Sequence, residues 1–125
     1  MILADTSIWI EFLRAREPVF SVLAPLLEQQ AVVGVQCVFG ELLQGARTAA
    51  ERRTILAYWE NIPKVDEHQL WIEAGQYSGE NNLLSKGVGL IDAAIMVAGR
   101  RSAAMIWTLD VRLARALSKA QTYVP

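Results

Sequence analysis

The stretch Met1-Ile-Leu-Ala-Asp5 has a counterpart near the other end of the chain, Ala104-Met-Ile-Trp-Thr-Leu-Asp110. Each is a short apolar run that ends in an aspartate. Runs of this length are typical of strands buried inside a sheet and are too short for a confident helix. We therefore predict two buried strands, each with a carboxylate at its carboxyl end.

A third apolar run, Ala31 to Val35, and two weaker ones, Ile62 to Val65 and Thr122 to Val124, complete the candidate strands. Between them, apolar residues recur at spacings of three and four, as in Leu90 to Ala98 and Leu113 to Leu117, which predicts helices. Alternating strands and helices indicate an α/β domain with a mostly parallel sheet covered by helices on both faces.

The composition indicates one domain over residues 1–125, because 125 residues with 53% hydrophobic content can bury a single core. The formal net charge of −1 excludes a generally basic nucleic-acid-binding protein, so any contact with nucleic acid must be local. A single cysteine, Cys37, excludes an internal disulfide and a zinc finger. With no signal-like start and no long apolar stretch, we expect a cytoplasmic protein that does not enter membranes.

Four acids are expected to converge. The carboxyl ends of parallel strands face one crevice, which brings Asp5 and Asp110 together. Glu41 lies one turn into the helical stretch after the second strand, and Asp92 lies near the start of the helix Leu90-Ile-Asp-Ala-Ala-Ile95. These helices can direct both side chains into the same crevice.

Carboxylates held close together repel one another unless a cation neutralises them. Oxygen ligands without nearby Cys or His favour Mg²⁺ or Mn²⁺. The chemistry that follows is phosphodiester hydrolysis by a metal-activated water, with one ion or two. The simpler interpretation is that Asp5 and Asp110 are only helix N-caps, and for either residue alone it is the better one. Asp92 and Glu41 have apolar neighbours in sequence, where an unpaired acid is costly. For Glu41 the alternative is a solvent-facing position on an amphipathic helix.

Taken together, four segments resemble the motifs of PIN-domain ribonucleases, and most closely those of VapC-type toxins from type II toxin-antitoxin systems. The resemblance spans nearly the whole chain, with the motifs in the family's order. They are Ile2-Leu-Ala-Asp-Thr-Ser-Ile-Trp-Ile10, Val38-Phe-Gly-Glu-Leu-Leu-Gln-Gly45, Leu90-Ile-Asp-Ala-Ala-Ile95 and Ile106-Trp-Thr-Leu-Asp110.

The resemblance implies a five-stranded parallel sheet and Mg²⁺- or Mn²⁺-dependent endoribonuclease activity, with homodimerisation and inhibition by a small antitoxin. It assigns the metal and the catalysis to the four acids, and makes three hydroxyl side chains candidate supports for them. The acids are Asp5, Glu41, Asp92 and Asp110, and the hydroxyls are Thr6, Ser7 and Thr108.

The chain departs from the family where many relatives have Phe two residues after the fourth acid and this chain has Arg112. Arg112 and Arg115 recur along the last helix and are candidate contacts for RNA phosphates, although a solvated helix face explains them equally well. Arg100-Arg101 follows the Asp92 helix, where positive charge favours a helix carboxyl end. His68 is the only histidine, and we assign it no catalytic role.

Three other functions share features with this sequence. An aspartyl-nucleophile phosphatase needs a second Asp where Ser7 stands. A receiver-like signalling module needs a phosphoacceptor, and Asp66 is poorly placed for that role. The alternative within the family is a catalytically silent PIN scaffold that binds RNA or a protein, which metal-dependent turnover distinguishes from an enzyme.

Overall fold

Two short parallel strands form the centre of the protein. The computed structural model describes residues 1–125 and pairs β1 (Ile2–Ala4) with β2 (Met105–Trp107). Leu3 lies opposite Ile106, and Ala4 opposite Trp107. The predicted strands are therefore confirmed in place, although β2 is shorter than expected. Because the strands are parallel, the residues that follow them leave the sheet at the same edge.

The expectation of about five strands is wrong, since the structure has only two. Three other segments join as isolated parallel bridges: Val32 to Ile2, Lys64 to Gly34, and Thr122 to Ile106. Each leaves the sheet before a second successive pair can form. The helix after Gly34 begins at Gln36, and Pro63, which precedes Lys64, has no N–H to donate to a ladder. The segments thus follow the predicted parallel arrangement without becoming strands.

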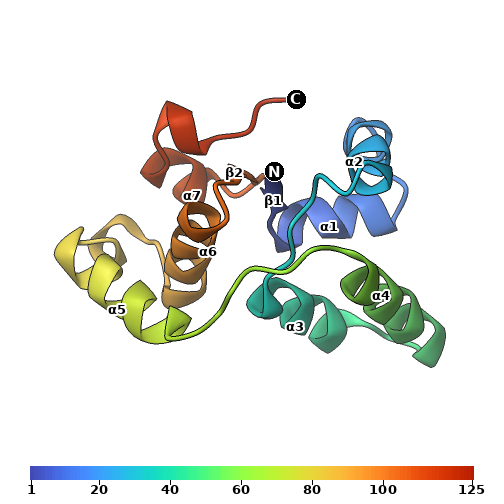
Figure 1. Cartoon of the computed structure of the whole chain (residues 1–125), viewed down its shortest axis with the longest axis horizontal. Coiled ribbons are helices and arrows are strands. Elements are labelled where there is room, and N and C mark those ends of the chain that lie inside the picture. The colour runs from blue at the N-terminus through green and yellow to red at the C-terminus, as the bar shows by residue number, and fades with distance from the viewer.

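Seven α-helices surround the two strands. Their bounds are α1 (Thr6–Leu13), α2 (Val19–Glu28), α3 (Gln36–Gly45), α4 (Ala49–Asn61), α5 (Leu70–Glu80), α6 (Leu90–Arg101) and α7 (Val111–Ala116), with single 3₁₀ turns η1 (Leu84–Lys86) and η2 (Lys119–Gln121). Figure 1 shows α1 to α4 on one side of the strands and α5 to α7 on the other. No helix has both the length and the apolar character needed to cross a membrane.

Helix α6 packs closely on the sheet. Seven consecutive residues, Ala93 to Gly99, are buried. A Cβ added to Gly99 would lie 3.1 Å from the side chain of Ile106 in β2, so a larger residue would push the helix away. This close packing fixes the start of α6, and with it Asp92, relative to the strand ends.

An aromatic cluster joins α1, α3 and α4. The ring of Trp9 lies with its centroid 5.0 Å from that of Phe39 and 5.6 Å from that of Tyr58. Phe12 packs edge-on against Trp9 at 5.8 Å. Large aromatic rings contribute much of the buried apolar area in a domain of this size. The cluster therefore holds the helices that carry Thr6 and Glu41 in fixed relation to each other.

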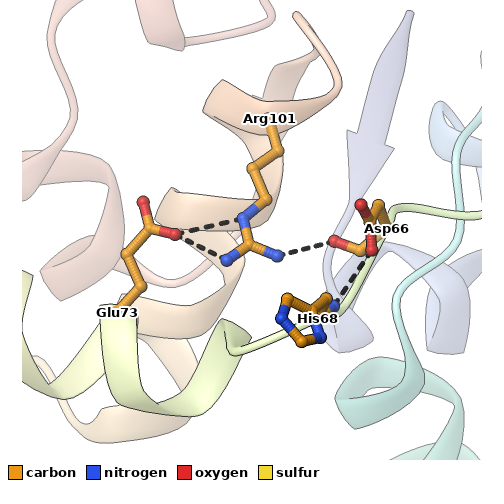
Figure 2. Close-up of polar contacts among 4 residues, drawn as sticks. All are labelled: Asp66, His68, Glu73 and Arg101. Carbon is orange, nitrogen blue, oxygen red and sulfur yellow. Dashed lines mark hydrogen bonds and ion pairs between the residues drawn. The ribbon is translucent and has the colours of Figure 1, made fainter.

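A polar network secures the linker between α4 and α5 (Figure 2). Arg101, the last residue of α6, forms an ion pair with Glu73 at 2.5 Å and donates to the backbone carbonyl of Asp66 at 2.8 Å. The carboxylate of Glu67 accepts the first N–H of α3, from Gln36, at 2.9 Å. Arg101 thus has specific partners beyond the general attraction of positive charge to a helix carboxyl end. His68 contributes only a backbone N–H, bonded to Asp66.

Candidate active site

Asp5 is the only polar or charged residue among the 33 that are buried, with 5% of its surface exposed. It directly follows β1 and caps α1, because its Oδ1 accepts the N–H of Ile8 at 3.2 Å. The hydroxyl of Ser7 donates to the same oxygen at 2.5 Å, and the hydroxyl of Thr108 donates to Oδ2. Burial raises the pKa of Asp5, although these hydrogen bonds act to lower it.

Asp110 is joined to Asp5 through the loop that follows β2. Its backbone N–H donates to the hydroxyl of Thr108 at 2.9 Å, and the N–H of Leu109 donates to the hydroxyl of Ser7 at 3.0 Å. The side chain of Asp110 caps α7: its Oδ1 accepts the N–H groups of Arg112 and Leu113. The two strand ends therefore form one hydrogen-bonded unit, built largely by the hydroxyls of Ser7 and Thr108.

Glu41 lies on α3 and is connected to this unit through Thr6, the first residue of α1. The hydroxyl of Thr6 donates to Oε1 of Glu41 at 2.7 Å. All three hydroxyls named as candidate supports, those of Thr6, Ser7 and Thr108, thus bond to one of the four acids. Glu41 itself is exposed, so only this one contact with Thr6 holds its carboxylate toward the start of α1.

Asp92 lies half-buried in the first turn of α6 and receives no hydrogen bond from another protein group. Its pKa is raised, first by burial and then by the negative charges of Asp110, Asp5 and Glu41. A charge–charge effect of this kind falls off with distance, and no hydrogen bond joins Asp92 to the other three acids. The four acids come from four separate segments of the chain.

The arrangement is nevertheless looser than a metal site. No three acid, histidine or cysteine side chains lie close enough together to hold an ion. Neither ion pair in the molecule, Arg16 with Glu11 or Arg101 with Glu73, involves one of the four acids. Their negative charge is thus not neutralised by a basic side chain of the protein.

The free oxygens of the acids are of the chemical type that a hard divalent cation prefers, although they are not gathered around one point. Asp110 uses only Oδ1 and Glu41 only Oε1 in hydrogen bonds, so each keeps one carboxylate oxygen free. Asp92 keeps both, and Asp5 has one donor on Oδ2, which leaves that oxygen a lone pair. Oxygen-only ligands of this kind suit Mg²⁺ or Mn²⁺ and disfavour zinc, which prefers nitrogen and sulfur.

The candidate RNA contacts lie on α7 beside Asp110. Arg112 packs against the loop that precedes α6: a Cβ on Gly87 would lie 3.1 Å from its Cδ. Gly87 has φ +78°, a left-handed conformation that glycine adopts most readily. The side chain of Arg112 therefore lies close over this glycine. Arg115 is exposed in the last turn of α7 and forms no ion pair.

Two arginines near Glu41 were not singled out from the sequence as partners of the acids. Arg14 and Arg47 line a cavity of about 570 Å³ that also borders Glu41. Arg14 ends α1 and Arg47 lies between α3 and α4. Both arginines lie just past the ends of the helices that carry Thr6 and Glu41. This sequence position could have indicated that they lie near the acids.

Residues 2–117 match the PIN domain family. The match covers nearly the whole chain, and the protein therefore belongs to the PIN domain family. PIN domains are generally metal-dependent nucleases and typically use Mg²⁺. A comparison with curated proteins finds no match.

Proposed function

We propose that the protein is a Mg²⁺- or Mn²⁺-dependent endoribonuclease that hydrolyses RNA phosphodiester bonds. The observation that carries this proposal is the hydrogen-bonded unit that joins Asp5 to the loop of Asp110 and, through Thr6, brings in Glu41, with no basic side chain paired to any of the four acids. Four acids that influence one another without a basic partner need an external cation. A divalent ion neutralises them, and membership of the PIN family supplies the class of reaction.

In this proposal the free oxygens of Asp5, Glu41, Asp92 and Asp110 hold the cation. When bound, the ion supplies a nucleophilic water and stabilises charge on the phosphoryl oxygens. The hydroxyls of Ser7 and Thr108 keep Asp5 oriented, and that of Thr6 keeps Glu41 oriented. Asp92 has no such support, so its carboxylate is the most free to adjust to the ion.

The test is cleavage of mixed cellular RNA by the purified protein with Mg²⁺ or Mn²⁺. We expect discrete products that disappear with EDTA and in the Asp5→Asn and Asp92→Asn variants. Glu60→Gln, which removes an exposed acid outside the site, is the matched control and should cleave like wild type. If folded protein binds RNA with either metal but never cuts it, the alternative of a catalytically silent scaffold replaces the enzyme.

We further propose that this nuclease is the toxin of a type II toxin-antitoxin pair, that it forms a homodimer and that a small antitoxin protein inhibits it. The support is the resemblance of the four motifs to VapC-type toxins. Induced expression should then arrest growth with the wild-type protein and not with Asp92→Asn at equal abundance. Sedimentation of the purified chain should give the mass of two copies. Unimpeded growth with active enzyme would contradict the toxin role.

A further inference from the structure

A cavity beside the acids has a lining that the proposed chemistry does not use. It lies among α1, α3 and α4 and has a volume of about 570 Å³, within the range of pockets that bind small ligands. Ile10, Leu13, Leu42 and Ile55 supply apolar lining. Glu41 also lines it, so whatever fills this cavity lies next to one of the four acids.

Two arginines and two glutamates line the cavity, so its charged residues balance in number. Arg14 and Arg47 both line it, and neither forms an ion pair with an acid of the protein. Glu51 also lines the cavity, but its carboxylate accepts the backbone N–H of Arg47 at 2.6 Å and lies in the first turn of α4. A negative charge is favourable at that end of a helix. In the proposed function the cation neutralises Glu41, and neither arginine is held in an ion pair, so both guanidinium groups can contact the phosphates of a ligand.

We infer that this cavity binds one unpaired nucleotide of an RNA strand, with the base against its apolar lining and the flanking phosphates on Arg14 and Arg47. The inference rests on the proposed nuclease function, which makes a phosphodiester the group that reaches Glu41. Apolar surface next to cations is the combination that single-stranded nucleic acid requires, and only an unpaired base can leave its stack to enter a pocket. A protein segment would find the apolar lining but would not need both cations.

The experiment measures RNA binding rather than cleavage. The Asp92→Asn protein in EDTA is titrated, by fluorescence anisotropy, into a labelled single-stranded oligouridylate about eight nucleotides long. Gly45 lines the cavity, and a Cβ there meets nothing within 4 Å, so the backbone accepts a side chain at this position and Gly45→Phe is chosen to obstruct the cavity. Gly75→Phe is its matched control, because Gly75 is equally open and lies on α5, away from the cavity.

We expect Gly45→Phe to weaken binding about tenfold, the loss typical of one stacked or buried base. Arg14→Ala and Arg47→Ala should each reduce the slope of log affinity against log salt by about 0.7, as for one phosphate contact on a single strand. Arg53→Ala, an exposed arginine of α4 that does not line the cavity, should leave the slope unchanged.

An abasic nucleotide moved along the oligonucleotide then identifies the bound base. One position should weaken binding to the protein with Gly45, and the same change should cost nothing further in Gly45→Phe. If the cavity variants bind RNA as tightly as the protein with an intact cavity, the inference is overturned. The absence of any RNA binding also overturns it, even if the cavity is then found to bind a protein segment. Cavity-dependent binding without cleavage by wild type would refute the nuclease and leave the nucleotide site standing. Cleavage without cavity-dependent binding would support the nuclease and refute the nucleotide site.

Discussion

The hydroxyl of Thr108 donates a hydrogen bond to the carboxylate of Asp5 across 103 positions of sequence. The same oxygen of Thr108 accepts the backbone N–H of Asp110. One side chain therefore orients the buried acid at the end of β1 and sets the backbone that carries the acid after β2. The candidate site depends on this contact as much as on the acids themselves.

Replacing Thr108 with Val should lower both stability and activity. The change leaves a buried oxygen of Asp5 without its donor, which costs about 1–3 kcal/mol of unfolding free energy. A lost support of this kind typically reduces metal affinity or activity about 10–100-fold. Urea denaturation and cleavage rates at saturating Mg²⁺ measure the two effects.

Thr122→Val is the matched control for that substitution, because the hydroxyl of Thr122 bonds only to the backbone of Ser118. Its cleavage rate should equal that of wild type. Equal losses of activity in the two variants would mean that Thr108 acts through general stability and not through Asp5.

Asp92→Asn should abolish cleavage and yet make the metal-free protein more stable at neutral pH. The pKa of Asp92 is raised, so between its ordinary value of 3.8 and the raised value the folded state holds a proton that the unfolded state has released. The contribution of this group to stability therefore falls as the pH rises through that interval. The stability gained by the Asn variant over wild type should grow across the same interval.

Thermal denaturation in EDTA from acid to neutral pH measures this difference. Glu60→Gln removes an exposed acid outside the cluster, and its difference from wild type should stay small at every pH. An Asn variant that is less stable than wild type at neutral pH would show that Asp92 has a stabilising partner, contrary to the structure.

The sequence predicted the proximity of Asp5 and Asp110 better than the extent of the sheet. Asp5 and Asp110 could be placed together because parallel strands expose their carboxyl ends at one edge. The structure also shows that capping a helix and joining the acid cluster are compatible roles, since one oxygen of Asp110 serves the helix and the other stays free. The N-cap interpretation is thus confirmed for both Asp5 and Asp110 without excluding a second role.

The parts that could not be predicted depend on contacts between distant segments. The apolar pattern of Ala31 to Val35 predicts an extended segment but not how many successive residues pair with a neighbouring strand. In the structure this segment forms only isolated bridges. Arg101 was placed correctly at a helix end. Its partners Glu73 and Asp66, however, lie on another helix and a linker, where only the packing of α5 on α6 could bring them.

Arg101→Met should destabilise the protein without changing cleavage per folded molecule. The guanidinium bonds both Glu73 and the carbonyl of Asp66, so we expect a loss of about 1–2 kcal/mol in unfolding free energy. Arg101→Lys should recover little, because an ammonium group lacks the planar fork that reaches both partners. Arg16→Met, which breaks the ion pair of a more exposed arginine with Glu11, should cost less than about 0.5 kcal/mol.

Mg²⁺ or Mn²⁺ should raise the thermal midpoint of the protein, because the ion relieves the repulsion at Asp92 only in the folded state. An ion present at about a hundred times its dissociation constant adds about 2.7 kcal/mol. For a chain of 125 residues that is a rise of about 10 °C.

Salt also screens repulsion, so NaCl of equal ionic strength is the necessary control, and it should produce a much smaller rise. Asp92→Asn removes a ligand and much of the repulsion together, and should therefore lose most of the response to the divalent ion. If NaCl raised the thermal midpoint as much as Mg²⁺, ionic strength alone would explain the stabilisation. The acids would then bind no specific divalent ion, and the proposed metal-dependent mechanism would be contradicted.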